Sequence, residues 1–343
     1  MYIYSILFFC INYILLFIYI YIYNTLNIMK VLVTGGTGLV GSAIKKYRPD
    51  WIYLGSKDGD LNNFEAVKNI LQKHKPDAII HLAANVGGLF KNISNRLEMF
   101  NSNIIINYNV LENAYNQGIK RVICCLSTCI FPDGLNRVLT EEDLHLGEPH
   151  NSNYGYAYAK RIMEVQCRLY NQSGADFHYQ CIIPTNVYGP NDNFNLENSH
   201  VIPGIIHKAY NHSCSNNKTE PFIILGTGLP KRQFIYSYDL AKIIINLLVH
   251  DITEPLLICS SPESKEVSIL DVAKIITTHF NITTVKTEIS EEEQGIVRDG
   301  QKIKTCSPSK LLKIMPNLEL TDLETGIADT VKWFLDTYPN IRK

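Results

Sequence analysis

The sequence lacks an excess of either charge. Its 32 Lys and Arg residues nearly balance 33 Asp and Glu residues, which gives a formal net charge of −1. A protein that binds nucleic acid through its overall charge carries a basic surplus, so the composition does not favour such a partner. A phosphate-bearing ligand must therefore be held locally, by a few placed groups.

The sequence also lacks paired cysteines. Nine cysteines are scattered along the 343 residues, without a Cys-x-x-Cys pair or the spacing of metal ligands. This pattern argues against a disulfide framework and against a zinc site. Reduced thiols in a cytoplasmic protein explain these cysteines better, and we expect no bound metal.

Charge is missing altogether from residues 1–28, which consist mainly of Tyr, Ile, Leu and Phe. The stretch is long enough to cross a bilayer, but it has neither the basic start nor the cleavage site of a signal peptide. A core strand begins directly after Met29, so a membrane helix would run into it without a linker. We interpret residues 1–28 as a dispensable extension from a mis-assigned start. A membrane anchor, with the protein facing the cytosol, is the alternative.

After Met29, short apolar runs alternate with longer amphipathic ones. Strands are predicted at 31–33, 51–54, 78–82 and 122–126, and helices at 39–47, 64–74 and 103–117. Strands without polar alternation are typical of a parallel sheet covered on both faces. We predict a Rossmann-type doubly wound α/β fold, with a ligand crevice at the carboxyl ends of the strands.

The alternation becomes irregular beyond Asn191, which suggests a second unit. We expect residues 29–190 to form the Rossmann domain and residues 191–343 to form mainly a smaller α+β substrate-binding domain. Segment 222–250 is expected to return to the first domain, with 222–225 as an added strand of its sheet.

A glycine-rich loop stands between the first strand and the first helix. Gly35, Gly38 and Gly41 permit a tight turn and a close approach of the backbone to a pyrophosphate, which binds at the positive end of the helix. The motif alone also fits a simple tight turn, but its position predicts a dinucleotide site. The residues expected to contact the cofactor here are Gly35, Gly36, Thr37, Gly38, Leu39, Val40 and Gly41.

The end of the second strand bears on the choice of cofactor. Leu54 to Lys57 offers no acid for a ribose 2′-hydroxyl, but it does offer Lys57 for a 2′-phosphate. Asp58 and Asp60 follow closely, and Lys57 could equally be a solvated loop lysine. We predict NADP(H) as the cofactor.

Tyr156 and Lys160 lie on one face of a predicted helix. A tyrosine with a pKa near 10 is a poor acid–base group at neutral pH until an ammonium stabilises its phenolate, and Lys160 can supply that charge. Ser127, at the end of the fourth strand, can hydrogen-bond the same substrate oxygen. An amphipathic helix with a surface lysine is the plainer alternative. With the glycine-rich loop, these residues predict a dinucleotide-dependent dehydrogenase.

Longer motifs around these residues are more specific. Over residues 30–342 the chain resembles the GDP-L-fucose synthases, which belong to the extended short-chain dehydrogenase/reductase family. The matching stretches are 82–88, 126–132, 184–194, 199–203, 226–228 and 232–236.

The resemblance implies a two-stage reaction on GDP-4-keto-6-deoxy-D-mannose: epimerisation at C3 and C5, then reduction of the 4-keto group by NADPH to give GDP-L-fucose. The keto group acidifies both C–H bonds, and epimerisation needs a base on one face and an acid on the other. The resemblance gives these roles to Cys129 and His200, residue types that can titrate near neutrality. Taken alone, Cys129 could be a small buried apolar residue and His200 a loop histidine. The implied catalytic residues are Ser127, Cys129, Tyr156, Lys160 and His200.

The resemblance also implies binding residues and a homodimer. Further cofactor contacts are expected from Asp60, Leu61, Lys160, Pro184, Asn186, Val187 and His200. Substrate contacts are expected from Asn186, Lys208, Leu225, Arg232, Asp299 and Lys304. Leu225 stands where the family commonly has tryptophan, which removes a stacking contact, and Lys208 stands where some members have arginine, which removes a bidentate phosphate grip.

Two other functions remain open. A different NAD(P)-dependent sugar-nucleotide epimerase or reductase, such as a 4-epimerase, would leave Cys129 and His200 without a role. A non-catalytic NADP-binding protein would not need the complete set of Ser127, Tyr156 and Lys160.

Overall fold

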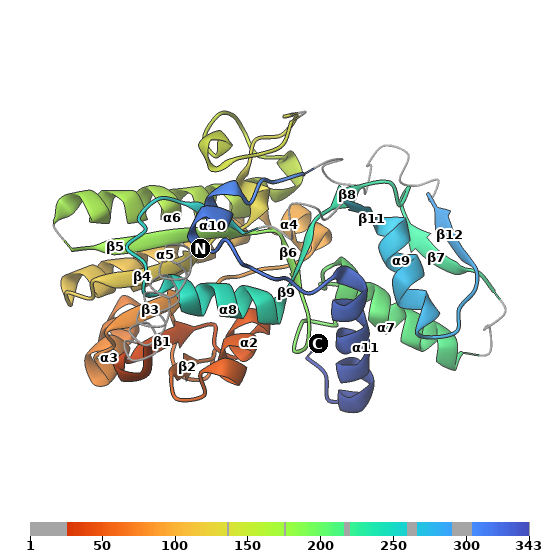
Figure 1. Cartoon of the computed structure of the whole chain (residues 1–343), viewed down its shortest axis with the longest axis horizontal. Helices are drawn as coiled ribbons and strands as arrows, with labels where there is room; N and C mark the ends of the chain where they lie inside the picture. Colours follow the sequence, from red (N-terminus) through yellow and green to blue (C-terminus); the bar gives the residue numbers. More distant parts are fainter. Residues whose placement is uncertain are drawn as a thin grey trace, which may run out of the picture.

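A six-stranded parallel sheet forms the centre of the larger lobe (Figure 1). The computed structural model describes residues 26–342 except 136, 175, 216–219, 259–265 and 290–303. In spatial order the strands are β10 (Leu256–Ile258), β5 (His178–Pro184), β4 (Arg121–Cys125), β3 (Ala78–His81), β1 (Val31–Thr34) and β2 (Ile52–Leu54). The chain passes from β1 outward to β2 and then back to β3 on the other side of β1. This switch point is where a crevice for a ligand forms.

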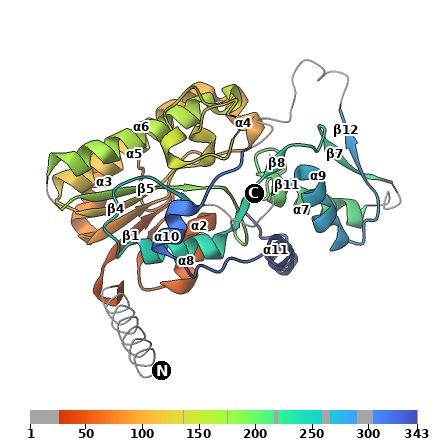
Figure 2. The same ribbon diagram turned by 45° about the horizontal axis from the view of Figure 1, so that its top comes forward.

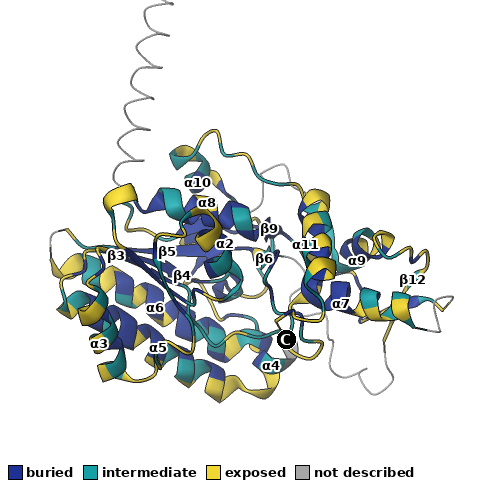
Figure 3. Ribbon diagram, turned by 90° about the horizontal axis from the view of Figure 1, so that it is seen from below, coloured by how far each residue is buried: buried dark blue, intermediate teal, exposed yellow. Residues whose placement is uncertain are grey.

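Helices cover both faces of the sheet, as predicted (Figure 2). One layer holds α3 (Phe64–His74), α5 (Arg96–Asn116) and α6 (Tyr154–Ser173), and the other holds α2 (Leu39–Tyr47), α8 (Ser237–Leu247) and α10 (Ser309–Ile314). Successive strand side chains point to opposite faces, so Leu32 packs in the first apolar cluster while Val31 and Val33 pack in the second. The strands are therefore mainly apolar on both faces, and Figure 3 shows them buried beneath helices with exposed outer turns.

The smaller lobe has its own apolar core. Its helices are α7 (Val201–Cys214), α9 (Ile269–Thr278) and α11 (Leu323–Thr337). Its short strand pairs are β7 (Phe222–Leu225) with β12 (Val285–Glu288), β8 (Lys231–Arg232) with β11 (Val267–Ser268), and β6 (Asn186–Tyr188) with β9 (Phe234–Tyr236). The remaining short elements are α4 (Leu89–Ser94), η1 (Thr128–Ile130), η2 (Glu141–Asp143) and η3 (Asn151–Asn153).

The expectation that 222–225 joins the main sheet is wrong. β7 pairs in parallel with β12 in the smaller lobe, and its residues alternate between buried and exposed, as in a sheet packed on one side. The strand that returns to the main sheet is β10, beside β5. Helix α8, which follows β7 within segment 222–250, does pack against α2. Both β7 and β10 are short apolar runs, so apolar character alone could not show which of them joins the main sheet. The domain boundary near residue 190 stays a prediction.

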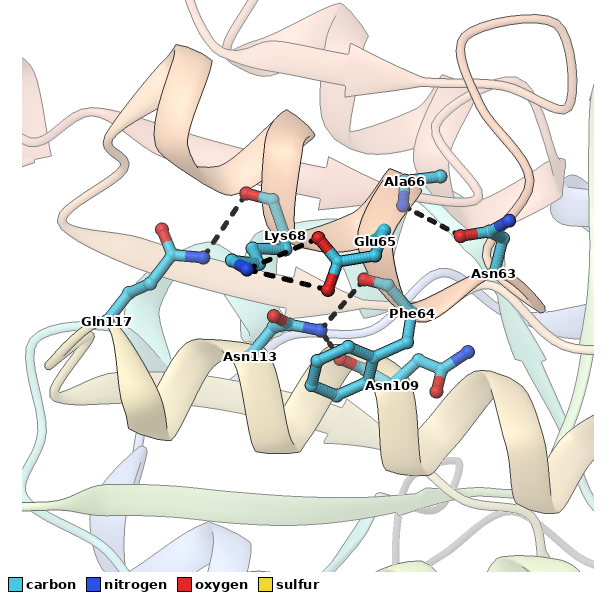
Figure 4. Close-up of polar contacts among 8 residues, drawn as sticks. All are labelled: Asn63, Phe64, Glu65, Ala66, Lys68, Asn109, Asn113 and Gln117. Carbon is cyan, nitrogen blue, oxygen red and sulfur yellow. Dashed lines mark hydrogen bonds and ion pairs between the residues drawn. The ribbon is translucent and has the colours of Figure 1, made fainter.

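Buried asparagines on α5 anchor the loop that follows β2 (Figure 4). Nδ2 of Asn113 donates to the carbonyl oxygen of Phe64 at 3.2 Å, and Nδ2 of Asn109 donates to that of Leu61 at 2.9 Å. Asn63 caps α3 by accepting from the backbone N–H of Ala66 at 3.0 Å. The Asn63 bond satisfies a backbone N–H at the start of α3, and the two asparagines of α5 hold the Leu61 loop and the first turn of α3 against α5.

The outer edge of the sheet is covered by a carboxylate. β10 is the terminal strand, and the backbone N–H of Leu257 donates to Oε1 of Glu141 at 2.9 Å. Glu141 is 8% exposed, and burial raises the pKa of its carboxyl group. The segment between β4 and α6 thereby closes this edge.

The predicted extension falls mostly on residues 1–25, which lie outside the described residues, so its origin stays a prediction. Leu26 packs in the same apolar cluster as Val31, and its carbonyl oxygen accepts a hydrogen bond from Nη2 of Arg48 at 2.7 Å. Within the described part of the chain, no helix is both long and apolar enough to cross a bilayer.

Candidate active site

A cavity of about 970 Å³ lies between the lobes, at the carboxyl ends of β1, β3 and β4. Its lining runs from the glycine-rich loop to α6 and across to His200 and Arg232 of the smaller lobe. Another hollow, near Pro76 and Gly118 at the opposite end of the sheet, contains none of the predicted site residues. The crevice expected from the strand order is therefore present.

The glycine-rich loop packs so closely against neighbouring backbone that side chains would not fit at two of its glycines. Gly35 has a φ of +67°, and a Cβ there would lie 2.8 Å from the backbone nitrogen of Ala83. A Cβ on Gly41 would lie 2.5 Å from the carbonyl oxygen of Gly35. Gly38 caps α2 without a side-chain hydrogen bond, so the first N–H groups of the helix are left for a ligand. This cradle fits a pyrophosphate.

Most of the predicted cofactor residues line this cavity. They are Gly35, Thr37, Gly38, Leu39, Val40, Gly41, Asp60, Leu61, Lys160, Pro184, Asn186, Val187 and His200. Gly36 is not in the lining, because it packs against β2, where a Cβ would lie 2.7 Å from Cβ of Tyr53.

Lys57 is exposed and does not line the cavity, so the structure gives it no contact with a cofactor bound there. Asp58, the acid next to Lys57, does not line the cavity either. Oδ2 of Asp58 accepts a hydrogen bond from the backbone N–H of Gly55 at 2.7 Å. The acid that directly follows Lys57 is therefore not presented to a cofactor ribose in the cavity, although Asp60 is in the lining.

The predicted catalytic residues of the larger lobe gather at the end of β4. Ser127 follows the strand and accepts the backbone N–H of Cys129 at 3.4 Å, at the start of η1. Lys160 on α6 is 1% exposed, and its Nζ donates to the carbonyl oxygen of Cys125 at 2.8 Å. The same Nζ lies 5.8 Å from the centre of the Tyr156 ring. All four predicted catalytic residues of this lobe, Ser127, Cys129, Tyr156 and Lys160, line the cavity.

Burial dominates the titration of the Tyr–Lys pair. It raises the pKa of Tyr156 well above 10.0, with Cys129 and Cys125 adding to the effect, and it lowers the pKa of Lys160. The expected stabilisation of the phenolate by Lys160 does not outweigh this burial. Tyr156 is therefore protonated at neutral pH, which is the form that can donate a proton to a substrate oxygen.

Burial shifts the Cys–His pair in opposite directions. It raises the pKa of the Cys129 thiol, an effect opposed by the charge of Lys304, and it lowers the pKa of His200. At neutral pH the thiol carries its proton and the imidazole is neutral. In these forms Cys129 can act as an acid and His200 as a base.

The predicted substrate residues divide into three groups. Asn186, Leu225, Arg232 and Lys304 line the cavity. Lys208 is exposed on α7 and is not in the lining, which separates it from the site in this structure. Asp299 lies outside the described residues. No group of acidic, histidine or cysteine side chains within the described ranges could hold a metal ion.

Asp192 and Arg342 are among the lining residues that were not singled out from the sequence. Asp192 is 4% exposed; its Oδ1 accepts the backbone N–H of Asn193 at 2.7 Å, and its Oδ2 has no partner among the described residues. Burial raises the pKa of Asp192 to about 7. Arg342 enters the cavity from the carboxyl end of the chain. Asp192 stands in the matching stretch 184–194, which was a signal for it, whereas nothing in the sequence pointed to Arg342.

Comparison with known proteins gives a consistent result. The model of the NAD dependent epimerase/dehydratase family matches residues 31–258. A Drosophila melanogaster protein named "Probable GDP-L-fucose synthase" is 44% identical over 92% of this chain and 99% of its own length. A GDP-L-fucose synthase of Dictyostelium discoideum is 44% identical over 93% and 99%. The crystal structure of a GDP-L-fucose synthetase from Naegleria fowleri bound to NADP superposes with a TM-score of 0.83 at 41% identity, covering 92% of this chain and 95% of that one.

Proposed function

Because the chain belongs to the NAD-dependent epimerase/dehydratase family, and within it to the GDP-L-fucose synthases, we propose that it converts GDP-4-keto-6-deoxy-D-mannose to GDP-L-fucose. The protein is an NADP(H)-dependent oxidoreductase with epimerase activity. One observation carries the assignment of residues. A single cavity is lined by the glycine-rich loop, by Ser127, Tyr156 and Lys160, and by the Cys129–His200 pair.

The cofactor end of the cavity fits NADP(H). The close approach at Gly35 and Gly41 and the uncapped start of α2 suit a pyrophosphate. Asp58 points into its own turn through its bond to Gly55 and does not line the cavity. NADPH, when bound, supplies the hydride that reduces C4. Lys160, beside Tyr156, is positioned to bind the nicotinamide ribose.

For the reduction, we assign proton donation to Tyr156. Its phenol is protonated, and Ser127 can donate a second hydrogen bond to the C4 oxygen. The buried ammonium of Lys160 favours the phenolate left after proton transfer, since opposite charges attract strongly where water is excluded.

For the epimerisation, we assign the proton transfers to Cys129 and His200. The substrate's 4-keto group stabilises the enolate that forms when a proton leaves C3 or C5. His200, neutral at pH 7, can accept that proton, and the Cys129 thiol can return one to the opposite face of the ring.

The cations Arg232 and Lys304 suit the diphosphate of the substrate. Burial lowers the pKa of Lys304, and the nearby charge of Arg232 lowers it further. An anionic diphosphate between them would relieve this repulsion. Asp299 and Lys208 stay predictions from the resemblance alone.

Solvent-exchange experiments can test the two stages separately. The full chain is incubated in D₂O with GDP-4-keto-6-deoxymannose, first with NADP⁺ and then with NADPH. Deuterium is expected at C3 and C5 without reduction in the first case, and loss of absorbance at about 340 nm with formation of GDP-L-fucose in the second. Cys129→Ser and His200→Asn should suppress exchange, whereas Tyr156→Phe should suppress reduction and retain exchange.

The other candidate functions give different results. A 4-epimerase that retains its cofactor would incorporate no deuterium at C3 or C5 and would consume no NADPH. A non-catalytic protein would bind NADP⁺ but would neither exchange protons of the keto sugar nor oxidise NADPH. Either pattern with a folded sample would overturn the proposal.

We also propose that the protein is a cytoplasmic homodimer. Exposed apolar side chains form a stripe on α6, made of Ile162, Val165 and Leu169, beside Ile105 and Tyr108 on α5. Helices α5 and α6 pack against each other, so the stripes make one apolar surface that a second copy could cover. The seven described cysteines are all free thiols, which suits a reducing compartment.

A further inference from the structure

The chain returns to the cavity at its carboxyl end. Ile341 is 7% exposed in the core of the smaller lobe, and the carbonyl oxygen of Arg342 accepts a hydrogen bond from the backbone N–H of Phe194 at 2.9 Å. Figure 1 shows this end between the two lobes, beside α11. Arg342 is therefore held by the smaller lobe while it faces the larger one.

The guanidinium of Arg342 lies over the glycine-rich loop. Its Nη1 is 3.7 Å from the position that a Cβ would take on Gly38, the residue that caps α2. The charge of Arg342 also lowers the pKa of both Asp192 and His200, which places the guanidinium near these two residues. Among the residues that the structure describes, it forms no hydrogen bond or ion pair through its side chain.

The loop itself offers little charge to a pyrophosphate. Its side chains at Thr37, Leu39 and Val40 are neutral, and the helix end contributes a partial positive charge of only about 0.5. Lys57 does not line the cavity. Lys160 is bonded to the end of β4, and Lys304 lies near Cys129, so these cations serve other parts of the site.

We propose that Arg342 binds the pyrophosphate of NADP(H), opposite the start of α2. The proposal rests on the cofactor assigned above. A guanidinium can grip a phosphate with two parallel hydrogen bonds, and its position beside Gly38 supplies the charge that the loop lacks. Because the smaller lobe carries Arg342, bound cofactor links the two lobes through this contact.

Binding affinities of the full chain test this role. Calorimetry measures the Kd of NADP⁺ and of NAD⁺ for the native protein, Arg342→Ala, Arg342→Lys and Lys332→Ala. Lys332 is an exposed cation on α11 outside the cavity lining, so it is the matched control. We expect Arg342→Ala to raise both Kd values by about 10-fold or more, and by the same factor, because both dinucleotides contain the pyrophosphate. The Kd values of Arg342→Lys should lie between those of the native protein and Arg342→Ala, and those of Lys332→Ala should stay within about twofold of the native values.

The KM for NADPH in the reduction assay gives a second readout. For Arg342→Ala it should rise together with the Kd, since the lost contact is to the cofactor. A rise in Kd for NADP⁺ alone would assign Arg342 to the 2′-phosphate and overturn the proposal. Unchanged Kd values, or a fall in kcat with unchanged Kd, would also overturn it. If the native protein binds NADP⁺ but does not reduce the keto sugar, the proposed function fails while the affinities still decide the role of Arg342.

Discussion

The Nζ atom of Lys160 donates a hydrogen bond to the carbonyl oxygen of Cys125, 2.8 Å away at the carboxyl end of β4. The contact joins α6 to the strand that leads into Ser127. It also keeps the ammonium 5.8 Å from the centre of the Tyr156 ring. Strand and helix together thus fix the spacing of the three groups assigned to the reduction.

Replacing Lys160 by methionine should separate activity from stability. We expect kcat to fall by about 100-fold or more, because the ammonium no longer favours the tyrosinate. The free energy of unfolding should change by only about 1 kcal/mol, since losing the bond to Cys125 is offset by no longer burying a charge. NADPH oxidation and urea unfolding measure the two effects. A loss of stability above about 3 kcal/mol with kcat intact would contradict the assigned role.

The pH profile of deuterium exchange should have a wide plateau. The pKa of His200 lies below its ordinary 6.5, and that of Cys129 lies above its ordinary 9.0. A reaction that needs a neutral imidazole and a protonated thiol loses kcat/KM only below pH 6.5 and only above pH 9.0. An acid limb centred above pH 7 would speak against His200 as the base.

Asp192 should make the native protein less stable as the pH rises from about 4 to about 7. Its pKa is about 7 in the fold and 3.8 ordinarily, so between these values the folded state binds more protons than the unfolded state. Asp192→Asn keeps an acceptor for the Asn193 N–H and carries no charge. Its stability relative to the native protein should therefore grow with pH and then level off above about 7. Urea unfolding at several pH values measures this, and a constant difference would refute the burial argument.

Asn109 should support cofactor binding from a distance. Asn109→Ala removes the bond from Nδ2 to the Leu61 carbonyl oxygen and should lower the free energy of unfolding by about 1–3 kcal/mol. Because Leu61 lines the cavity, the Kd of NADP⁺ should rise as well. Asn116→Ala on the same helix is the control, since Asn116 is exposed and should change stability by no more than about 0.5 kcal/mol. Equal changes in unfolding free energy and in the Kd of NADP⁺ for the two substitutions would show that Asn109 does not support cofactor binding.

Leu169→Glu should produce a monomer if the apolar stripe on α6 is the dimer interface. Leu169 is 59% exposed, so the charge should be tolerated in the free subunit but not at an interface. Light scattering measures the mass of the native protein and the variant. Leu196→Glu, at an exposed apolar residue away from α5 and α6, is the matched control. A native protein that is monomeric at micromolar concentration would rule out the proposed dimer.

The sequence predicted four of the six strands of the main sheet, β1 to β4, because these strands are largely apolar on both faces, and it did not predict β5 or β10. Val31, Leu32 and Val33 pack into clusters on opposite sides, and such uninterrupted runs stand out against amphipathic helices. The same property caused the error at 222–225. An apolar run of this length fits either sheet, and only the tertiary pairing of β7 with β12 decides.

The site was predictable where a motif has a mechanical reason for its spacing. The glycine-rich loop and the pair Tyr156 and Lys160 depend on local geometry, so the chain order shows them. Lys57 could not be judged in this way, because the direction of a loop side chain depends on its surroundings. Arg342 could not be predicted as a site residue for a different reason. It reaches the loop around Gly38 from the other end of the chain, and no local pattern encodes such a contact.

The hydrogen bond between the Leu257 backbone and Glu141 bears on the tendency of this protein to aggregate. An exposed outer strand is a template on which another chain can add by hydrogen bonding, and here the template is closed by a buried side chain rather than by a further strand. Growth of the sheet from one molecule into the next is thereby blocked at β10. Protection of this edge therefore depends on Glu141, which does not line the cavity, so losing its bond would leave β10 open to aggregation while the catalytic groups stay in place.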